Sequence, residues 1–172
     1  MSDAVVLPDL ATLRRRWSTL AVAYQSRGVE GVWMSTPTTD SYVDPAGSRM
    51  DLLEVAPSYA VLTAFDRELT DPAPGHPLDF FVDAPLWVPR APLIPSWPVG
   101  DVVWFEDGRW HRSAAVRDVP RAVEVLATPL LDDESLAEEL STLPGLPSPS
   151  AAPAPLPPPV GQTPRSTVPP PA

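Results

Sequence analysis

The sequence predicts a single α+β domain: a mostly antiparallel sheet that follows an N-terminal helix and precedes two C-terminal helices. Three observations lead to this prediction. An apolar stripe of helical period lies near the N-terminus, a strong hairpin signal lies past the middle, and the extended segments are grouped together. Strands that alternate with helices are typical of parallel sheets, so this grouping favours an antiparallel sheet.

A change in composition divides the chain into residues 1–142 and 143–172. The segment from Pro144 to Ala172 holds 12 of the 26 prolines and a single charged residue, Arg165. Such a segment cannot bury enough apolar surface to offset the entropy lost on ordering it. We therefore predict a globular domain over 1–142, followed by a proline-, alanine- and serine-rich tail over 143–172 that is disordered or extended.

The first expected element is a helix over about residues 8–27. Apolar residues recur there at three- and four-residue steps: Leu10, Leu13, Trp17, Leu20 and Tyr24. Pro8 suits the first turn, Asp9 favours the positive end of the helix, and Gly28 suits a left-handed cap. The basic run 14–16 falls mainly outside the stripe, so we expect a solvated helix face rather than a phosphate site.

Three strands are expected after this helix, over residues 29–35, 50–55 and 59–69. Residues 36–50 are rich in Thr, Ser, Asp, Pro and Gly, which is typical of a loop. The segment 59–69 also fits a helix capped by Ser58. The β-branched and aromatic residues in its first half favour a strand.

Residues 78–99 are both aromatic and rich in proline, which argues against a helix or a central strand. We expect a short strand over 79–83 and then an extended segment that lies across the surface of the domain.

A β-hairpin is expected over residues 101–113. Asp107-Gly108 lies between two runs of aromatic and β-branched residues, which is a strong signal for a tight hairpin turn. Trp104 and Trp110 are expected to face each other across the two strands.

Two helices are expected to complete the domain. The first is capped by Asp118 and runs over 119–126, and the second begins at Asp132 or Asp133 and ends at Leu140.

Composition excludes several classes of function. The formal net charge is −10, which opposes nucleic acids and anionic membranes as partners. No cysteine is present, so disulfides and cysteine-ligated metals are excluded. The absence of lysine and asparagine and the abundance of arginine, alanine and proline indicate a GC-rich bacterial genome. No signal peptide or membrane-spanning stretch is seen, so we expect a cytoplasmic protein.

No catalytic, cofactor or metal motif stands out in the sequence. His76 and His111 are 35 residues apart without paired spacing, so we predict structural histidines and no metal site. Asp40, Asp44, Asp51 and Glu54 have the chemistry for a cation site or a carboxylate pair. They lack a calcium-loop pattern, so a solvated acidic loop is expected.

The aromatic cluster is the most unusual feature of the predicted domain. As candidate binding residues we name five of its members: Trp87, Trp97, Trp104, Phe105 and Trp110. Aromatic side chains offer large contact areas at low entropy cost and can form a groove that binds polyproline helices. The alternative interpretation is that the same rings form the hydrophobic core.

The function that we predict is binding of another protein, without catalysis and without a cofactor. An adaptor or accessory subunit would act through an acidic, aromatic surface and through the proline-rich tail. One alternative is an immunity protein that neutralises a basic toxin by charge complementarity. A second alternative is a small-ligand domain or an enzyme with a tryptophan-lined pocket near His111, which would use Asp101, Glu106 or Asp107 as its carboxylate.

Overall fold

The structure is a computed structural model that describes residues 3–69, 80, 81, 83–88, 99–113 and 121–143 of the 172-residue chain. Several predictions concern residues outside these ranges: the tail beyond Leu143, His76, Trp97, the Asp118 cap and most of the segment 78–99.

Seven strands form one sheet in the order β1-β7-β6-β5-β4-β3-β2, and every neighbouring pair is antiparallel. Strands β2 to β7 follow one another as a meander, while the two-residue β1 pairs with β7. Their bounds are β1 Asp3–Ala4, β2 Trp33–Ser35, β3 Thr39–Val43, β4 Arg49–Ala56, β5 Tyr59–Phe65, β6 Asp101–Glu106 and β7 Arg109–Arg112.

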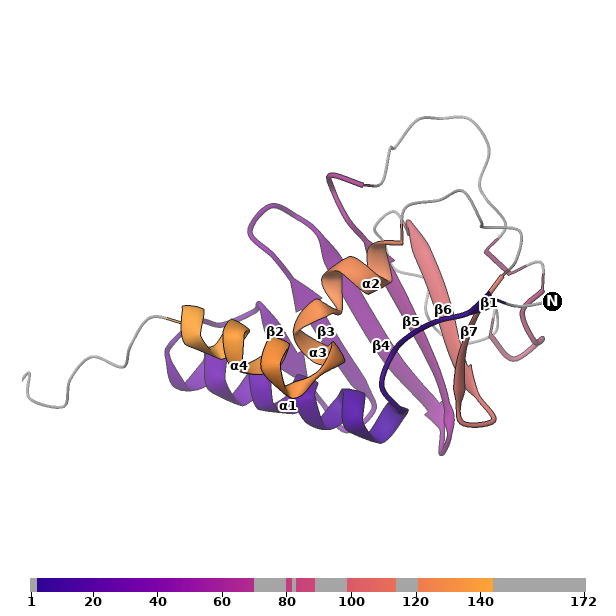
Figure 1. Ribbon diagram of the computed structural model, residues 1–172, viewed down its shortest axis with the longest axis horizontal. Coiled ribbons are helices and arrows are strands. Elements are labelled where there is room, and N and C mark those ends of the chain that lie inside the picture. Colours follow the sequence, from indigo (N-terminus) through magenta and orange to yellow (C-terminus); the bar gives the residue numbers. More distant parts are fainter. Residues whose placement is uncertain (1–2, 70–79, 82, 89–98, 114–120, 144–172) are drawn as a thin grey trace, which may run out of the picture.

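Helices cover one face of this sheet (Figure 1). They are α1 Leu10–Ser26, α2 Ala122–Leu126, α3 Thr128–Leu131 and α4 Asp133–Thr142. The predicted α+β domain with a mostly antiparallel sheet, an N-terminal helix and C-terminal helices is confirmed. None of the described helices is both long and apolar enough to cross a membrane.

Helix α1 forms where its sequence pattern places it. All five residues of the predicted stripe are buried. The carboxylate of Asp9 accepts a hydrogen bond from the Thr12 backbone N–H at 2.9 Å, so Asp9 is the N-cap residue. Gly28 follows the helix with a φ of 73°, a left-handed conformation that glycine adopts without steric cost.

The main core lies between the helices and the sheet, and a smaller one lies on the opposite face. The smaller core contains Val61, Val88, Val102 and Trp104, with Trp87 packed against it. The sheet therefore has apolar side chains on both of its faces.

Three predicted elements differ from the structure. The expected loop over 36–50 contains strand β3, and the C-terminal region has a third short helix, α3, with Pro129 in its first turn. The described residues of the expected strand 79–83 (80, 81 and 83) are in turns. The segment 59–69, whose sequence also fits a helix, forms a strand over Tyr59–Phe65.

The hairpin between β6 and β7 is confirmed. Asp107 and Gly108 have φ values of 52° and 75°, as a type I′ turn requires. The expected pairing of Trp104 with Trp110 is wrong, because Trp104 lies opposite His111 and Trp110 lies opposite Phe105. Side chains alternate along a strand, so this one-residue difference in register places the two tryptophans on opposite faces of the sheet.

A buried ion-pair network joins this hairpin to α2. The guanidinium of Arg112 donates to both carboxylate oxygens of Asp101, at 2.9 and 2.7 Å, and to Glu124 at 2.8 and 2.6 Å. Asp101 also accepts from the backbone N–H of Val123 at 3.1 Å. Burial raises the pKa of Asp101 above its ordinary value, and the bonds from Arg112 oppose this rise.

Candidate functional site: a groove beside an open sheet edge

Strand β2 is an edge strand, and its outer peptide groups are directed away from the sheet. On its inner side, the carbonyl of Val32 accepts from the N–H of Val43 at 2.9 Å, and the N–H of Thr36 donates to Thr39 at 2.8 Å. Bonded pairs alternate along an antiparallel ladder. The N–H and C=O groups of Trp33 and Ser35 therefore point outward, and no described residue provides a backbone partner for them.

This edge carries little of the protection usual for exposed strands. Natural sheets discourage edge pairing with charged side chains, proline or a bulge. Residues 33–35 are Trp-Met-Ser, without charge or proline, and the pairing of β2 with β3 is regular. Within the described part of the chain, the shortness of β2 is its protective feature. Such an edge is chemically ready to accept another strand.

A pocket of about 690 Å³, which we call the edge pocket, lies between β2 and the second half of α1. Its lining includes Val22 of α1 and Met34 of β2, which are 63% and 41% exposed. Glu30 is the one charged residue in its lining. The edge pocket is therefore lined by polar and apolar surface in nearly equal parts, and it lies beside the outward peptide groups of β2.

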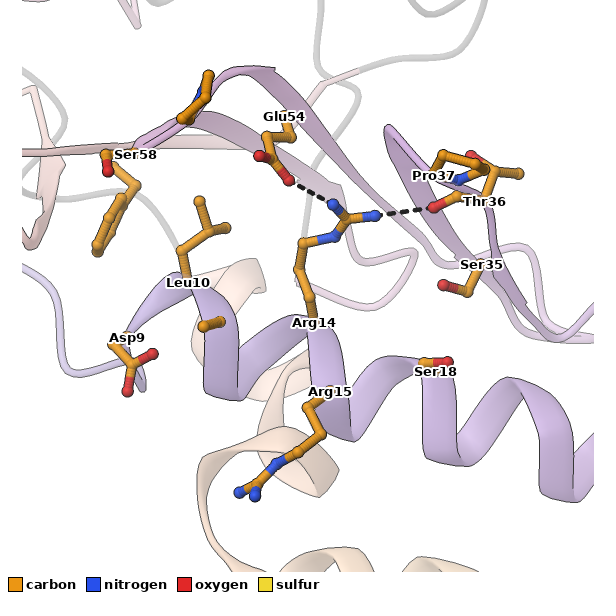
Figure 2. Close-up of a pocket in the computed structure, with 13 residues that line it drawn as sticks. Asp9, Leu10, Arg14, Arg15, Ser18, Ser35, Thr36, Pro37, Glu54 and Ser58 are labelled. Carbon is orange, nitrogen blue, oxygen red and sulfur yellow. Dashed lines mark hydrogen bonds and ion pairs between the residues drawn. The ribbon is translucent and has the colours of Figure 1, made fainter.

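A second pocket, of about 910 Å³, lies where β2 ends, between the first half of α1 and the turns that connect β2 to β3 and β4 to β5 (Figure 2). We call it the turn pocket. Ser18 and Ser35 line both pockets. The two pockets are thus adjacent, and together we call them the α1–β2 groove.

Arg14 holds α1 in place at this groove. Its side chain reaches from the helix toward Glu54 and the carbonyl of Thr36, whereas Arg15 points away from the strands (Figure 2). The Arg14 guanidinium donates to Thr36 at 2.8 Å and to the buried carboxylate of Asp40 at 3.0 Å, and it pairs with Glu54. One side chain therefore fixes the distance between α1 and the strands that border the groove.

Asp40 is fully buried beneath the groove and is held on both oxygens. Ser35 donates its hydroxyl to one oxygen at 2.5 Å, and Arg14 binds the other. Burial raises the pKa of Asp40 above its ordinary value, while the bonds from Ser35 and Arg14 act in the opposite direction. This bonding turns the Ser35 side chain inward and leaves its peptide group at the edge.

The charged residues near the groove differ from two expectations. Arg14 and Arg16 are not on a solvated face. Arg14 is directed into the contacts described above, and Arg16 binds Asp133 and the carbonyls of α3. Only Arg15 of that run is exposed. The expected solvated acidic loop is also wrong in part, since Asp40 and Asp51 are buried.

The structure divides the described members of the predicted aromatic binding set between the two faces of the sheet: Phe105 and Trp110 on the helix-covered face, Trp104 and Trp87 on the other. Trp104, Phe105 and Trp110 are 2%, 6% and 3% exposed, so they form part of the cores, and only Phe105 also lines the turn pocket. Trp87 is half-buried, and its indole N–H donates to Glu106 at 3.2 Å. Trp97 lies outside the described residues.

His111 lies away from the groove. Its ring stacks on Trp104 with centroids 6.0 Å apart, and neither pocket of the groove includes it in its lining. Among the described residues, no group of histidine and acidic side chains is arranged to hold a metal ion. The groove itself offers hydroxyl groups, peptide groups and apolar contact, which are the means of binding an extended chain.

Sequence reasoning missed the residues that form the edge pocket. Val22 carried one available signal, since it is an apolar residue outside the buried stripe of α1. Met34 carried no such signal, because alternation along β2 directs its side chain to the face opposite Trp33, so it borders the pocket only at the edge of the sheet. The signal from Val22 does not identify β2 as an edge, which depends on the order of strands in the sheet.

Comparison with protein-family models, curated proteins and solved structures finds no match for this chain. The groove therefore has to be interpreted from its own geometry.

Proposed function

We propose that this chain is a non-enzymatic protein-binding protein, and that it binds an extended segment of its partner by pairing it with β2. The observation that carries this proposal is the weakly protected edge, where the peptide groups of Trp33 and Ser35 point outward beside the edge pocket and its exposed Val22. Main-chain hydrogen bonds to such an edge provide affinity, and pockets for alternate side chains provide specificity.

The alternation of side chains defines the segment that fits. Partner residues opposite Trp33 and Ser35 direct their side chains to the face covered by α1, where the edge pocket lies. A residue between them lies opposite Met34, on the other face. We therefore expect a partner segment of extended conformation whose residue beside Val22 is apolar.

The charge of the chain favours a basic partner. With a net charge of −10, the protein attracts positively charged proteins at long range and favours productive encounters with them. An adaptor and an immunity protein that neutralises a basic toxin are both forms of the proposed function. We also propose that the protein is bacterial and cytoplasmic, and this part of the proposal rests on the composition of the sequence.

Selection from a phage-displayed library of random peptides tests this proposal without a known partner. We expect the selected peptides to share an extended pattern with an apolar anchor. The Ser35→Pro variant should weaken binding of a selected peptide at least about tenfold, because one edge N–H donor is lost. Ser35→Ala, which loses only the hydroxyl bond to Asp40, controls for that bond and should bind nearly as well as the wild type. The dissociation constants are measured by fluorescence anisotropy.

A matched pair of valine variants locates the peptide. Val22→Asp places a charge in the edge pocket and should weaken binding by roughly tenfold or more. Val125→Asp makes the same substitution at an exposed valine of α2 that lies outside the linings of both pockets. This variant should have little effect on binding. Equal effects of the two variants, or unchanged binding by Ser35→Pro, would rule out the groove as the binding site.

A further inference from the structure

We propose that a second copy of this chain pairs with the same edge when no partner segment is bound, and forms a two-fold dimer centred on Met34. This inference rests on the proposed function, because it assigns a competing occupant to the same groove. It implies that self-pairing regulates access to β2.

The register of such a dimer follows from the outward peptide groups. These groups belong to Trp33 and Ser35, which lie symmetrically on either side of Met34. In an antiparallel pair, Trp33 of one copy then lies opposite Ser35 of the second copy, and the reverse also holds. Each of these two pairs exchanges two N–H···O=C bonds. A two-fold axis through Met34 therefore satisfies all of the outward groups of β2.

The side chains at this edge are compatible with self-pairing. Residues 32–36 (Val-Trp-Met-Ser-Thr) carry no charge, so the central contact brings no like charges together. The net charge of −10 opposes association at long range, but salt screens charges more than ~8 Å apart at physiological ionic strength. The two Met34 side chains meet across the axis, on the face of the sheet that α1 does not cover, and reduce their mutual exposure to water.

The dimer is expected to be weak. A contact between two three-residue strands and their neighbouring side chains buries less than the ~1,200 Å² that is typical of stable interfaces. Weak pairing suits a regulatory role, because a partner segment that also fills the edge pocket would displace the second copy.

A single engineered cysteine tests the register directly, since the chain has none of its own. In the proposed dimer the two Met34 residues form a non-bonded antiparallel pair, with a Cα–Cα distance of about 4.5 Å that permits a disulfide. Met34→Cys should therefore become crosslinked under mild oxidation, several times faster than Val55→Cys. Val55 is a suitable control because it is 42% exposed, close to the 41% of Met34, and it lies at an irregularity of β4, a strand inside the sheet and not at its edge. Crosslinking is measured on non-reducing gels.

Light scattering on the cysteine-free chain gives a second readout. The wild type should show a concentration-dependent increase in mass toward a dimer, and Ser35→Pro should not. Self-pairing is overturned if Met34→Cys crosslinks no faster than Val55→Cys, with both variants folded by circular dichroism. It is also overturned if the wild type stays monomeric at about millimolar concentration.

The two proposals fail in different ways. If self-pairing fails but a selected peptide still binds the wild type and not Ser35→Pro, only the dimer is excluded. If the Met34→Cys dimer forms but no selected peptide depends on the groove, the dimer is supported and the proposed function is excluded.

Discussion

Replacing Arg112 by alanine is expected to lower the free energy of unfolding by about 3–5 kcal/mol, the cost typical of removing one partner from a buried ion pair. Asp101 is 1% exposed and Arg112 is 5% exposed, so the carboxylate left behind cannot reach water. The same substitution releases Glu124 and so disconnects α2 from the hairpin. Chemical denaturation monitored by tryptophan fluorescence measures the loss.

The matched control is Arg109→Ala, on an exposed position of the same strand. It should change stability by less than about 0.5 kcal/mol.

The loss caused by Arg112→Ala should also depend on pH. Without Arg112 the pKa of Asp101 rises further, and a raised carboxyl pKa favours the folded state when the pH falls. The variant should therefore regain part of its stability between about pH 7 and about pH 5. A loss no larger than that of Arg109→Ala would show that the network does not stabilise the fold.

Replacing Trp104 by alanine is expected to cost about 3–5 kcal/mol, as is typical of buried aromatic residues. Its side chain packs against Val61 and Val102 in the smaller core and stacks on His111. If Trp104 were instead a binding residue, as the aromatic cluster suggests from sequence, its removal would affect binding more than stability. Denaturation of the variant by urea distinguishes these cases.

Trp87→Ala is the control for this substitution. Trp87 is half-buried and makes an edge-on contact with Tyr59, with ring centroids 5.3 Å apart. Its removal should cost only ~1–2 kcal/mol, because less apolar surface is exposed to water. An equal or larger loss for Trp87 would contradict the assignment of Trp104 to the core.

The elements that could be predicted from the sequence are those set by local signals. Helix α1 combines an apolar stripe with a capping aspartate and a terminal glycine, all of which lie within the helix or next to it. The hairpin depends on Asp107-Gly108, two neighbouring residues with positive φ. In both cases the physical cause and its sequence signal lie within a few residues of each other.

Strand β3 could not be predicted, because its cause is distant in the sequence. Its first three residues are polar, and Asp40 is buried in a strand where Ser35 and, from α1, Arg14 bind its carboxylate. The prediction of a solvated face for the basic run of α1 is wrong for the same reason, since the partners of Arg16 lie more than 100 residues away. A pairing between distant charges leaves no periodic pattern in either segment.

The candidate site depends on the arrangement of the whole sheet. The sequence shows that residues 33–35 suit a strand, but their edge position follows from the order of all seven strands. The groove also requires α1 to lie beside that edge, where Arg14 holds it. Protein binding, the class of function that composition suggests, stays a prediction that the structure does not test.

The central claim is that the outer peptide groups of β2 receive a partner strand, and amide hydrogen exchange measures this most directly. In dilute protein, the amides of Trp33 and Ser35 should exchange faster than the amide of Met34, which is directed toward β3. Saturation with a selected peptide should slow exchange at Trp33 and Ser35 at least about tenfold and change Met34 little. Unchanged exchange at Trp33 and Ser35 while the peptide is bound would contradict the claim.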